Sequence, residues 1–336
     1  MSLRVEIGVF SHNEAEGLAS TLSSMLAQDI FSSDVLAHLI VLANGCTDST
    51  VDVARSIDHP ALRVVDLPQG GKSRTWNSFV HEISALEADI LIFADADIVL
   101  PDRAALQRLA KGLAAQSSLF ALSSQPVKDI SLTSEKLTLT ERLIAASAGG
   151  MDDWQTSICG QLYAMPAARA RQFSMPIGLP VEDGFLRAMV LTDNLTTTEV
   201  LSRLGGLSGV RHVYGSERSV PALIRHQVRI VIGSAINAAI FTALRRLPPE
   251  ERAEELQTAA RDDGWLTAVL KAELPRAPFG YVPVHFLTKR LVRLFAQGQS
   301  RNPRRILLAL LGFVFDFIVY VFAQIKMLRG TGAGYW

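Results

Sequence analysis

Cysteine is almost absent from this chain of 336 residues, which contains only Cys46 and Cys159. Two cysteines are too few for a disulfide framework and match the usage of a reducing compartment. The seven histidines are scattered without metal-ligand spacing, and neither a zinc cysteine pattern nor H-E-x-x-H occurs. A catalytic zinc site is therefore not expected.

The chain also lacks net charge, since 33 Lys and Arg balance 33 Asp and Glu. No global field attracts nucleic acid, so no nucleic-acid partner is expected and any electrostatic site must be local. The first residues read as a short alternating strand, without a long apolar run and a small-residue cleavage site. No signal peptide is expected, and the catalytic face is predicted to be cytosolic.

Two common nucleotide motifs are missing. After the first apolar run only Gly8 is present, so the G-x-G-x-x-G fingerprint of nicotinamide enzymes is absent. The Gly71-Lys72-Ser73 string resembles the end of a P-loop, but Asp66 stands where that motif requires glycine. An ATPase is therefore excluded.

Unbroken hydrophobic runs are scarce in the first two thirds of the chain, and the excess apolar content lies after about residue 220. Residues 230–244 are almost entirely apolar and bracketed by arginines, which is compatible with a membrane interface. Residues 306–323 form a second run, marginal for spanning a bilayer. Asp316 in its middle would cost about 2.5–3.5 kcal/mol at the bilayer centre, so spanning and interfacial burial both stay open.

The first hundred residues alternate short apolar runs with segments of helical spacing, which is typical of βαβ units. Buried parallel strands are predicted at 5–10, 38–43, 62–65 and 90–94. The sequence thus predicts an α/β fold in which a mixed, mainly parallel, Rossmann-like sheet is flanked by helices. We expect three regions: a catalytic domain at 1–215, an amphipathic helical region at 216–300, and a hydrophobic, membrane-associated C-terminal helix with its tail at 301–336.

Polar residues follow the predicted strands, at the edge where parallel sheets bind ligands. Asp95-Ala96-Asp97 puts two carboxylates at the end of the fourth strand, and such oxygen ligands suit Mg²⁺ or Mn²⁺ bridging a diphosphate. Taken alone, this pair is a weak signal, and a solvated cap of the next helix is its simpler explanation. Glu182-Asp183 is a second carboxylate pair, and an acidic first turn of a helix is its simpler explanation.

Several strings together resemble the family 2 glycosyltransferases with a GT-A fold, over about residues 4 to 233. They are Val9-Phe10-Ser11-His12-Asn13-Glu14, Asn44-Gly45-Cys46-Thr47-Asp48-Ser49-Thr50, Gly71-Lys72-Ser73 with Asn77, and the Asp95 pair. The resemblance implies a nucleotide-binding set of Phe10, Ser11, His12, Glu14, Asn44, Lys72, Asp95 and Arg229. It also implies a divalent metal, Mg²⁺ or Mn²⁺, at Asp95 and Asp97. Ala43 departs from the pattern, because the family often has Asp there.

The resemblance extends to the acceptor side. Glu182-Asp183 resembles the family's Glu-Asp pair, which implies that Asp183 is the general base of an inverting transfer. Cys159, Gly160 and Gln161 resemble the acceptor-side segment of cellulose-synthase-like members.

Arg229 matches the arginine of the Gln-x-x-Arg-Trp element of processive members, although that element's Gln and Trp are replaced here. Arg229 would clamp the diphosphate, and a snorkelling arginine beside an interfacial helix is the simpler explanation. The missing Trp predicts one sugar added per encounter.

The predicted function is an inverting transferase that moves a sugar from a nucleotide-diphosphate sugar, with UDP-sugar expected, to a lipid-linked glycan, a lipid or a polysaccharide precursor. We expect it at the cytoplasmic face of the inner membrane, held peripherally or by one C-terminal helix.

Two alternatives stay open. A sugar-phosphate nucleotidyltransferase would need a basic, glycine-rich loop after the first strand, where residues 11–16 contain neither Arg nor Lys. An inactive nucleotide-binding membrane scaffold requires the two carboxylate pairs to lie apart.

Overall fold

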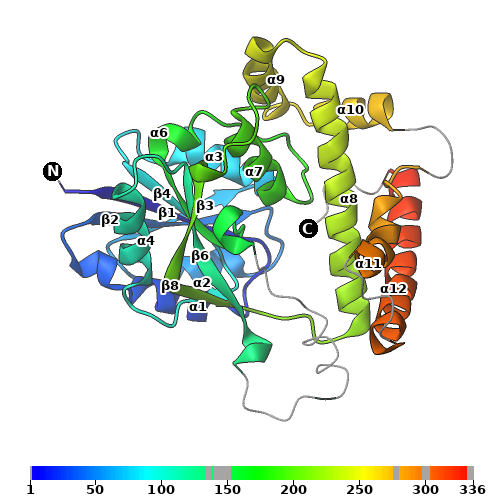
Figure 1. Cartoon of the computed structure of the whole chain (residues 1–336). Helices are drawn as coiled ribbons and strands as arrows, with labels where there is room; N and C mark the ends of the chain where they lie inside the picture. The colour runs from blue at the N-terminus through cyan, green and yellow to red at the C-terminus, as the bar shows by residue number, and fades with distance from the viewer. Residues whose placement is uncertain (1, 133–137, 139–152, 275–279, 297–302, 331–336) are drawn as a thin grey trace.

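The computed structural model describes residues 2–132, 138, 153–274, 280–296 and 303–330 (Figure 1). Within these ranges the chain forms one mixed sheet covered by helices on both faces, with a long helical region to one side. Residues 331–336 of the predicted C-terminal tail lie outside the described residues.

The described part of the sheet has eight strands in the order β3-β2-β1-β4-β7-β6-β8-β5. The strands are β1 Arg4–Ser11, β2 Leu36–Asn44, β3 Leu62–Leu67, β4 Ile90–Asp95, β5 Ile98–Val99, β6 Ala121–Lys128, β7 Leu162–Pro166 and β8 Leu204–Tyr214. β3, β2, β1 and β4 are parallel, whereas β7 is antiparallel to both β4 and β6. The predicted α/β class, the mixed sheet and the four parallel strands are confirmed.

The helices cover the two faces of the sheet and then continue beyond it. They are α1 Leu18–Leu26, α2 Thr50–Arg55, α3 Lys72–Ser78, α4 Ala105–Ala114, α6 Ala167–Ala170, α7 Glu182–Thr192, α8 Val220–Arg245, α9 Arg252–Ala259, α10 Trp265–Glu273, α11 His285–Ala296 and α12 Pro303–Leu328. Apolar side chains of α1 and α4 pack on one face of the sheet, and those of α3, α7 and α8 pack on the other. Strands buried on both faces need continuous apolar runs, which is why the sequence reveals them.

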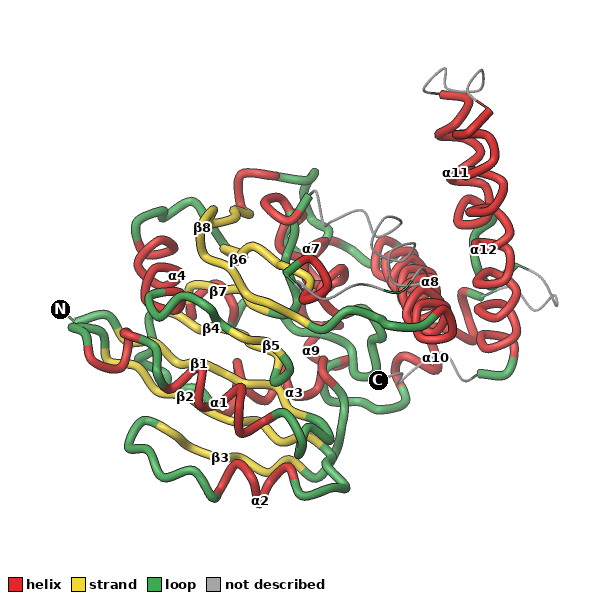
Figure 2. The backbone as a smooth tube through the Cα atoms, turned by 90° about the horizontal axis from the view of Figure 1, so that it is seen from below, coloured by secondary structure: helices red, strands yellow, loops and turns green. Residues whose placement is uncertain are grey.

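α8 begins shortly after the boundary predicted at residue 215 and contains the apolar run 230–244. Ser219 caps it by accepting a hydrogen bond from the amide of Ala222 at 3.3 Å, and Pro221 stands in its first turn, where its missing N–H is harmless. α12 packs beside α8 and α11, and Figure 2 shows the α11–α12 pair extending away from the sheet. α8 and α12 are long and apolar enough to cross a membrane, although 56% of the apolar window of α8 is buried inside the protein.

Candidate active site

The candidate site lies at the carboxyl ends of β1, β2 and β4, where the sequence predicts it. Asn44 at the end of β2 is fully buried, and both ends of its amide are used. Its Nδ2 donates to the carbonyl of Ser11 at 2.8 Å, and its Oδ1 accepts from the amide of Gly71 at 3.2 Å. The backbone carbonyl of Asn44 also lies 2.7 Å from Nδ1 of His12. Asn44 therefore fastens the ends of β1 and β2 to the turn that opens α3.

Glycines shape this turn because the backbones approach too closely for side chains. Gly45 has φ +57°, and a Cβ there would lie 2.6 Å from the backbone nitrogen of Gly70. Gly71 has φ +124°, a conformation that other residues rarely adopt. These glycines aim Lys72, the first residue of α3, into the site.

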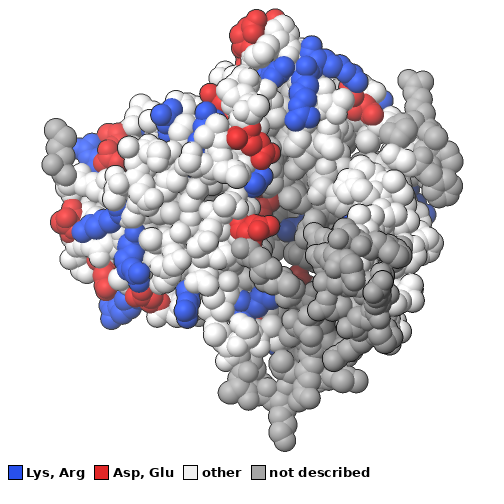
Figure 3. Space-filling model, in the orientation of Figure 1, with Lys and Arg blue, Asp and Glu red and all other residues white. Residues whose placement is uncertain are grey.

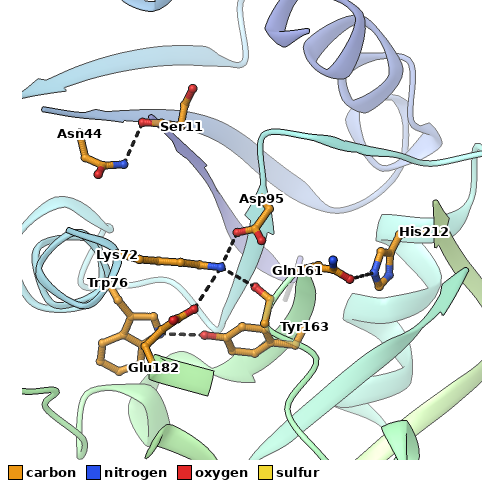
Figure 4. A network of polar contacts seen from close by, with 10 residues as sticks. Ser11, Asn44, Lys72, Trp76, Asp95, Gln161, Tyr163, Glu182 and His212 are labelled. Atoms are coloured by element: carbon orange, nitrogen blue, oxygen red, sulfur yellow. Dashed lines mark hydrogen bonds and ion pairs between the residues drawn. The ribbon is translucent and has the colours of Figure 1, made fainter. Parts of the chain in front are cut away.

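Lys72 is the hub that joins three segments distant in sequence (Figure 4). Its Nζ lies 2.7 Å from Oδ1 of Asp95 and 3.1 Å from Oε1 of Glu182, and it donates to the carbonyl of Gly160 at 3.2 Å. Burial disfavours the ammonium, but the negative charges of Asp95 and Glu182 outweigh burial and raise the pKa of Lys72. Lys72 therefore stays charged and holds the two carboxylate segments together.

An aromatic stack forms the wall below Lys72. The rings of Phe93 and Tyr163 stack with centroids 4.6 Å apart, and Trp76 donates its Nε1–H to the hydroxyl of Tyr163 at 2.9 Å. This wall is apolar towards the ion pairs, so it lowers the local dielectric. A cavity opens here, lined by Phe10, Lys72, Trp76, Phe93, Gly160, Tyr163, Glu182, Asp183 and Leu186.

Asp183 reaches this cavity from the first turn of α7. Its Oδ1 accepts from the amide of Gly184 at 2.7 Å, and a Cβ at Gly160 would lie 3.1 Å from its Oδ2. Burial, reinforced by the charge of Glu182, raises the pKa of Asp183 to about 6, while the cations of Lys72 and Arg229 oppose the rise. A carboxylate in this state is ionised at neutral pH and basic enough to accept a proton.

The carboxylates after β4 face those of the first loop. Burial raises the pKa of Asp95 to about 6, against the opposing charge of Lys72, while Asp97 is exposed. Burial, and then the charges of Asp97 and Asp95, raise the pKa of Glu14, so these three carboxylates are close enough to interact electrostatically. Ser11 adds a buried hydroxyl that has no hydrogen-bond partner in the described structure.

Asp95 and Asp97 suit a divalent metal shared with a diphosphate. The described residues contain no cluster of three His, Cys, Asp or Glu that could hold a metal by itself. Mg²⁺ is usually held by one or two carboxylates together with substrate phosphates, and Mn²⁺ accepts similar oxygen ligands. One largely buried carboxylate, Asp95, and one exposed carboxylate, Asp97, at the end of β4 match that requirement.

The segment before β7 carries the predicted acceptor-side residues and is anchored from β6 and β8. The amide of Cys159 donates to Oγ of Ser123 at 3.0 Å. Oε1 of Gln161 lies 3.0 Å from Nε2 of His212, whose Nδ1 lies 2.7 Å from Oγ of Ser124. Burial lowers the pKa of His212 to about 4, so it is a neutral hydrogen-bonding group. Because the carbonyl of Gln161 also accepts from the amide of Asp95 at 2.9 Å, this anchor extends to β4.

Arg229 is half-buried on α8, and its charge is felt by Asp183. No hydrogen bond or ion pair joins it to another residue in the described part of the chain. Arg229 is not among the residues that line the cavity with Lys72 and Asp183, but it is close enough for its charge to lower the pKa of Asp183. Its position makes it available to an anionic ligand.

Sequence reasoning missed Trp76, Tyr163 and His212. The pair of Trp76 and Tyr163 is separated by 87 residues and joined across β4, so no local spacing marks it. His212 sits in a glycine-containing segment that reads weakly as a strand. The one sequence signal that could have led to His212 was its partner Gln161, which is predicted on the acceptor side and lies 51 residues away.

The comparisons with known proteins agree with this geometry. The family model described as Glycosyl transferase family 2 matches residues 6–188, more than half of the chain. The chain belongs to glycosyl transferase family 2. It is a glycosyltransferase with a GT-A type of fold, as the motifs predicted, and its family excludes the nucleotidyltransferase alternative. No curated protein matches this glycosyltransferase.

Among solved structures, this glycosyltransferase is similar to a mannosyltransferase from Pyrobaculum calidifontis in complex with GDP-Man and Mn²⁺. The two share 18% identity with a TM-score of 0.55, over 98% of this chain and 88% of that one. A glucosyl-3-phosphoglycerate synthase from Mycobacterium tuberculosis, in complex with Mn²⁺, UDP-glucose and phosphoglyceric acid, matches at 21% identity with a TM-score of 0.47. That match covers 69% of this chain and 78% of that one.

Proposed function

We propose that this glycosyltransferase inverts the anomeric carbon as it moves a sugar from a nucleotide-diphosphate sugar to an acceptor hydroxyl. One observation carries the proposal: Lys72 joins Asp95 and Glu182, and Asp183 reaches the same cavity. The carboxylates proposed for the metal and for the proton transfer therefore serve one site. This convergence argues against an inactive scaffold, which would leave the two pairs apart.

The donor would bind along the ends of β1, β2 and β4. Phe10, Ser11, His12, Glu14 and Asn44 are the proposed base and ribose side, with the unpartnered hydroxyl of Ser11 free to bond the nucleotide. Asp95 and Asp97 would hold the divalent metal, which neutralises the charge that develops on the leaving diphosphate. Lys72 and Arg229 are the cations that we propose bind the phosphate oxygens. We keep UDP-sugar as the proposed donor.

In the transfer, the acceptor oxygen attacks the anomeric carbon while the bond from that carbon to the diphosphate oxygen breaks. Asp183 takes the acceptor proton, and the leaving electron pair stays on the nucleotide diphosphate. The pKa of Asp183, about 6, keeps it ionised at neutral pH for this role. Cys159, Gly160 and Gln161 are the proposed acceptor side. Gly160 lies so close to Asp183 that it has no room for a side chain, so the acceptor would meet the backbone there.

We further propose that a lipid bilayer covers α12, because its exposed face is apolar, whereas its buried face carries the polar Asp316 and Gln324 beside apolar core residues such as Val319 and Ala323. Exposed apolar residues recur along it at spacings of three and four, namely Leu307, Leu310, Leu311, Val314, Phe317, Ile318, Val321, Phe322, Ile325 and Leu328. Asp316 and Gln324 instead face the protein, and Gln324 accepts from the amide of Tyr281 at 3.1 Å. In the view of Figure 3, the described surface of this region is nearly free of charge.

The packing of α12 along α8 and α11 favours a hairpin lying in the membrane interface over a solitary spanning helix. Because Asp316 faces the protein, its carboxylate does not have to enter the lipid, and the energetic cost that counted against lipid contact no longer applies. A bilayer on this side fits a lipid, a lipid-linked glycan or a polysaccharide precursor as acceptor, at the cytoplasmic face of the inner membrane. Flotation with liposomes tests this: Leu311→Asp with Phe317→Asp should abolish flotation while donor hydrolysis persists. Unchanged flotation, or a soluble dimer through this face, would oppose it.

The transferase proposal is tested with purified protein, a labelled donor and extracted lipid acceptors. Asp183→Asn should lower kcat by about 10²- to 10⁴-fold, the usual contribution of a general base, and leave donor affinity nearly intact. Asp58→Asn is a matched control, because Asp58 is exposed and lies just before β3, at the amino ends of the parallel strands rather than at the carboxyl ends that carry the site. Full activity of Asp183→Asn would remove Asp183 from the reaction.

A further inference from the structure

One face of α8 is directed at the first turn of α7, which carries Asp183. Arg229, Gly233, Asn237 and Phe241 stand four residues apart, so they form a single ridge along the helix. Three members of this ridge touch α7 or the residue before it. The run 230–244, which reads from sequence as an interfacial segment, thus also forms part of the site.

Gly233 lets the backbone of α8 lie directly on Val181. A Cβ at Gly233 would be 2.3 Å from Cγ2 of Val181 and 2.7 Å from its Cβ. Glycine weakens a helix interior relative to alanine, so a glycine in the middle of α8 needs a packing reason. The contact with Val181, the residue immediately before Glu182, supplies it.

Asn237 is a lone amide in the apolar part of α8 and is only 6% exposed. Its Nδ2 donates to the carbonyl of Val181 at 3.1 Å, while its Oδ1 is buried without a hydrogen-bond partner in the described structure. A buried amide that leaves one atom unsatisfied is unfavourable for folding. Its single bond holds the peptide that leads into Glu182 and Asp183.

The same turn of α7 is held at two further points. Phe241 stacks on Phe185 with centroids 5.6 Å apart and planes at 29°. On the opposite side, Gly160 abuts Asp183, with a Cβ there 3.1 Å from Oδ2. α8 therefore holds the residues on either side of Asp183 in the sequence, Val181 and Phe185, while Gly160 abuts the Asp183 side chain.

We propose that Asn237 and Gly233 are positioning residues that hold Asp183 at the distance from the acceptor hydroxyl that proton transfer requires. The inference rests on the proposed role of Asp183 as general base. A base that moves by about 1 Å loses on the order of 10²-fold in rate, whereas the donor, bound at the strand ends, is unaffected. α8 thereby links the C-terminal helical region to the transfer step.

The experiment compares Asn237→Leu and Gly233→Ala with wild type in kcat, in donor dissociation constant and in melting temperature. Leucine keeps the approximate shape of Asn237 without its donor, and the new methyl of Gly233→Ala displaces Val181. We expect kcat to fall about 10- to 100-fold in both, with donor affinity nearly unchanged. The melting temperature should stay near wild type in Asn237→Leu and fall modestly in Gly233→Ala, because the new methyl overpacks against Val181. Adding Val181→Gly, which clears the space for that methyl, should restore activity to Gly233→Ala but not to Asn237→Leu. Thr242→Ala, on the exposed side of α8, is the matched control and should behave as wild type.

Wild-type kcat in both variants, or a loss that follows melting temperature and donor affinity together, would overturn the positioning role. Failure of the proposed function looks different, because then the wild-type enzyme transfers no sugar or Asp183→Asn transfers it at full rate. These two results involve neither Asn237 nor Gly233.

Discussion

The loss of activity at low pH, the acid limb of the pH profile, should result from protonation of Asp183. Burial, together with the charge of Glu182, raises the pKa of this carboxylate to about 6, and only its ionised form can accept the acceptor's proton. Activity should therefore be lost as the pH falls through 6. An ordinary aspartate, with a pKa of about 3.9, would be ionised throughout the range from pH 5 to pH 7 and would leave kcat flat.

The size of the effect follows from the ionised fraction. At pH 5, one unit below a pKa of about 6, roughly one Asp183 in eleven is ionised, and at pH 7 roughly ten in eleven are. We expect kcat to rise about tenfold over this range. Arg229→Gln should move the limb to higher pH, because the arginine's charge lowers the pKa of Asp183.

The assay is kcat at saturating donor from pH 4.5 to pH 8, repeated at increasing Mn²⁺. Asp95 also has a pKa of about 6, but a bound metal competes with its proton, so any part of the limb due to Asp95 should recede as Mn²⁺ rises. The part due to Asp183 should stay. A flat profile with intact circular dichroism, or a limb that vanishes at high Mn²⁺, would refute the assignment.

Three further predictions can be checked with the same protein. Asp97→Asn should abolish metal-dependent turnover with the fold retained, as measured by Mn²⁺ titration and circular dichroism, and full activity would remove Asp97 from the mechanism. His212→Leu should reduce stability by about 1–3 kcal/mol in urea unfolding, because it removes the imidazole that bonds Oε1 of Gln161 and Oγ of Ser124, and Ser124 keeps only its bond to the carbonyl of Leu162; an unchanged midpoint would contradict this. Gly45→Ala should weaken UDP binding more than tenfold, since a Cβ would lie 2.6 Å from the backbone of Gly70, and calorimetry showing wild-type affinity would oppose it.

The parallel half of the sheet could be predicted because burial on both faces demands apolar runs, as at 38–43 and 90–94. The far half could not. β8 contains three glycines and pairs with β6 across a register shift, and β5 has only two residues. Such strands are defined by their neighbours rather than by their own composition. Likewise, the sequence does not show that Asp316 faces the protein, because this orientation depends on how α12 packs against the other helices.

The candidate site divides in the same way. Asp95 and Asp97 follow a recognisable strand, so position alone indicated them, whereas Glu182 and Asp183 were indicated by resemblance and otherwise read as the start of a helix. Lys72 brings together Asp95 and Glu182, which no local pattern connects because they are far apart in the sequence. Asn237 was visible as an amide in an apolar run, but its role required the position of Val181.

The central claim is tested most directly by nucleotide-diphosphate release from UDP-, GDP- and dTDP-sugars with Mn²⁺ or Mg²⁺, with and without EDTA, beside Asp97→Asn and with extracted lipid acceptors. We predict release from one donor, with UDP-sugar expected, that is abolished by EDTA and by Asp97→Asn and stimulated by acceptor. Release that persists undiminished in EDTA, or no release from any donor with acceptor supplied, would contradict it.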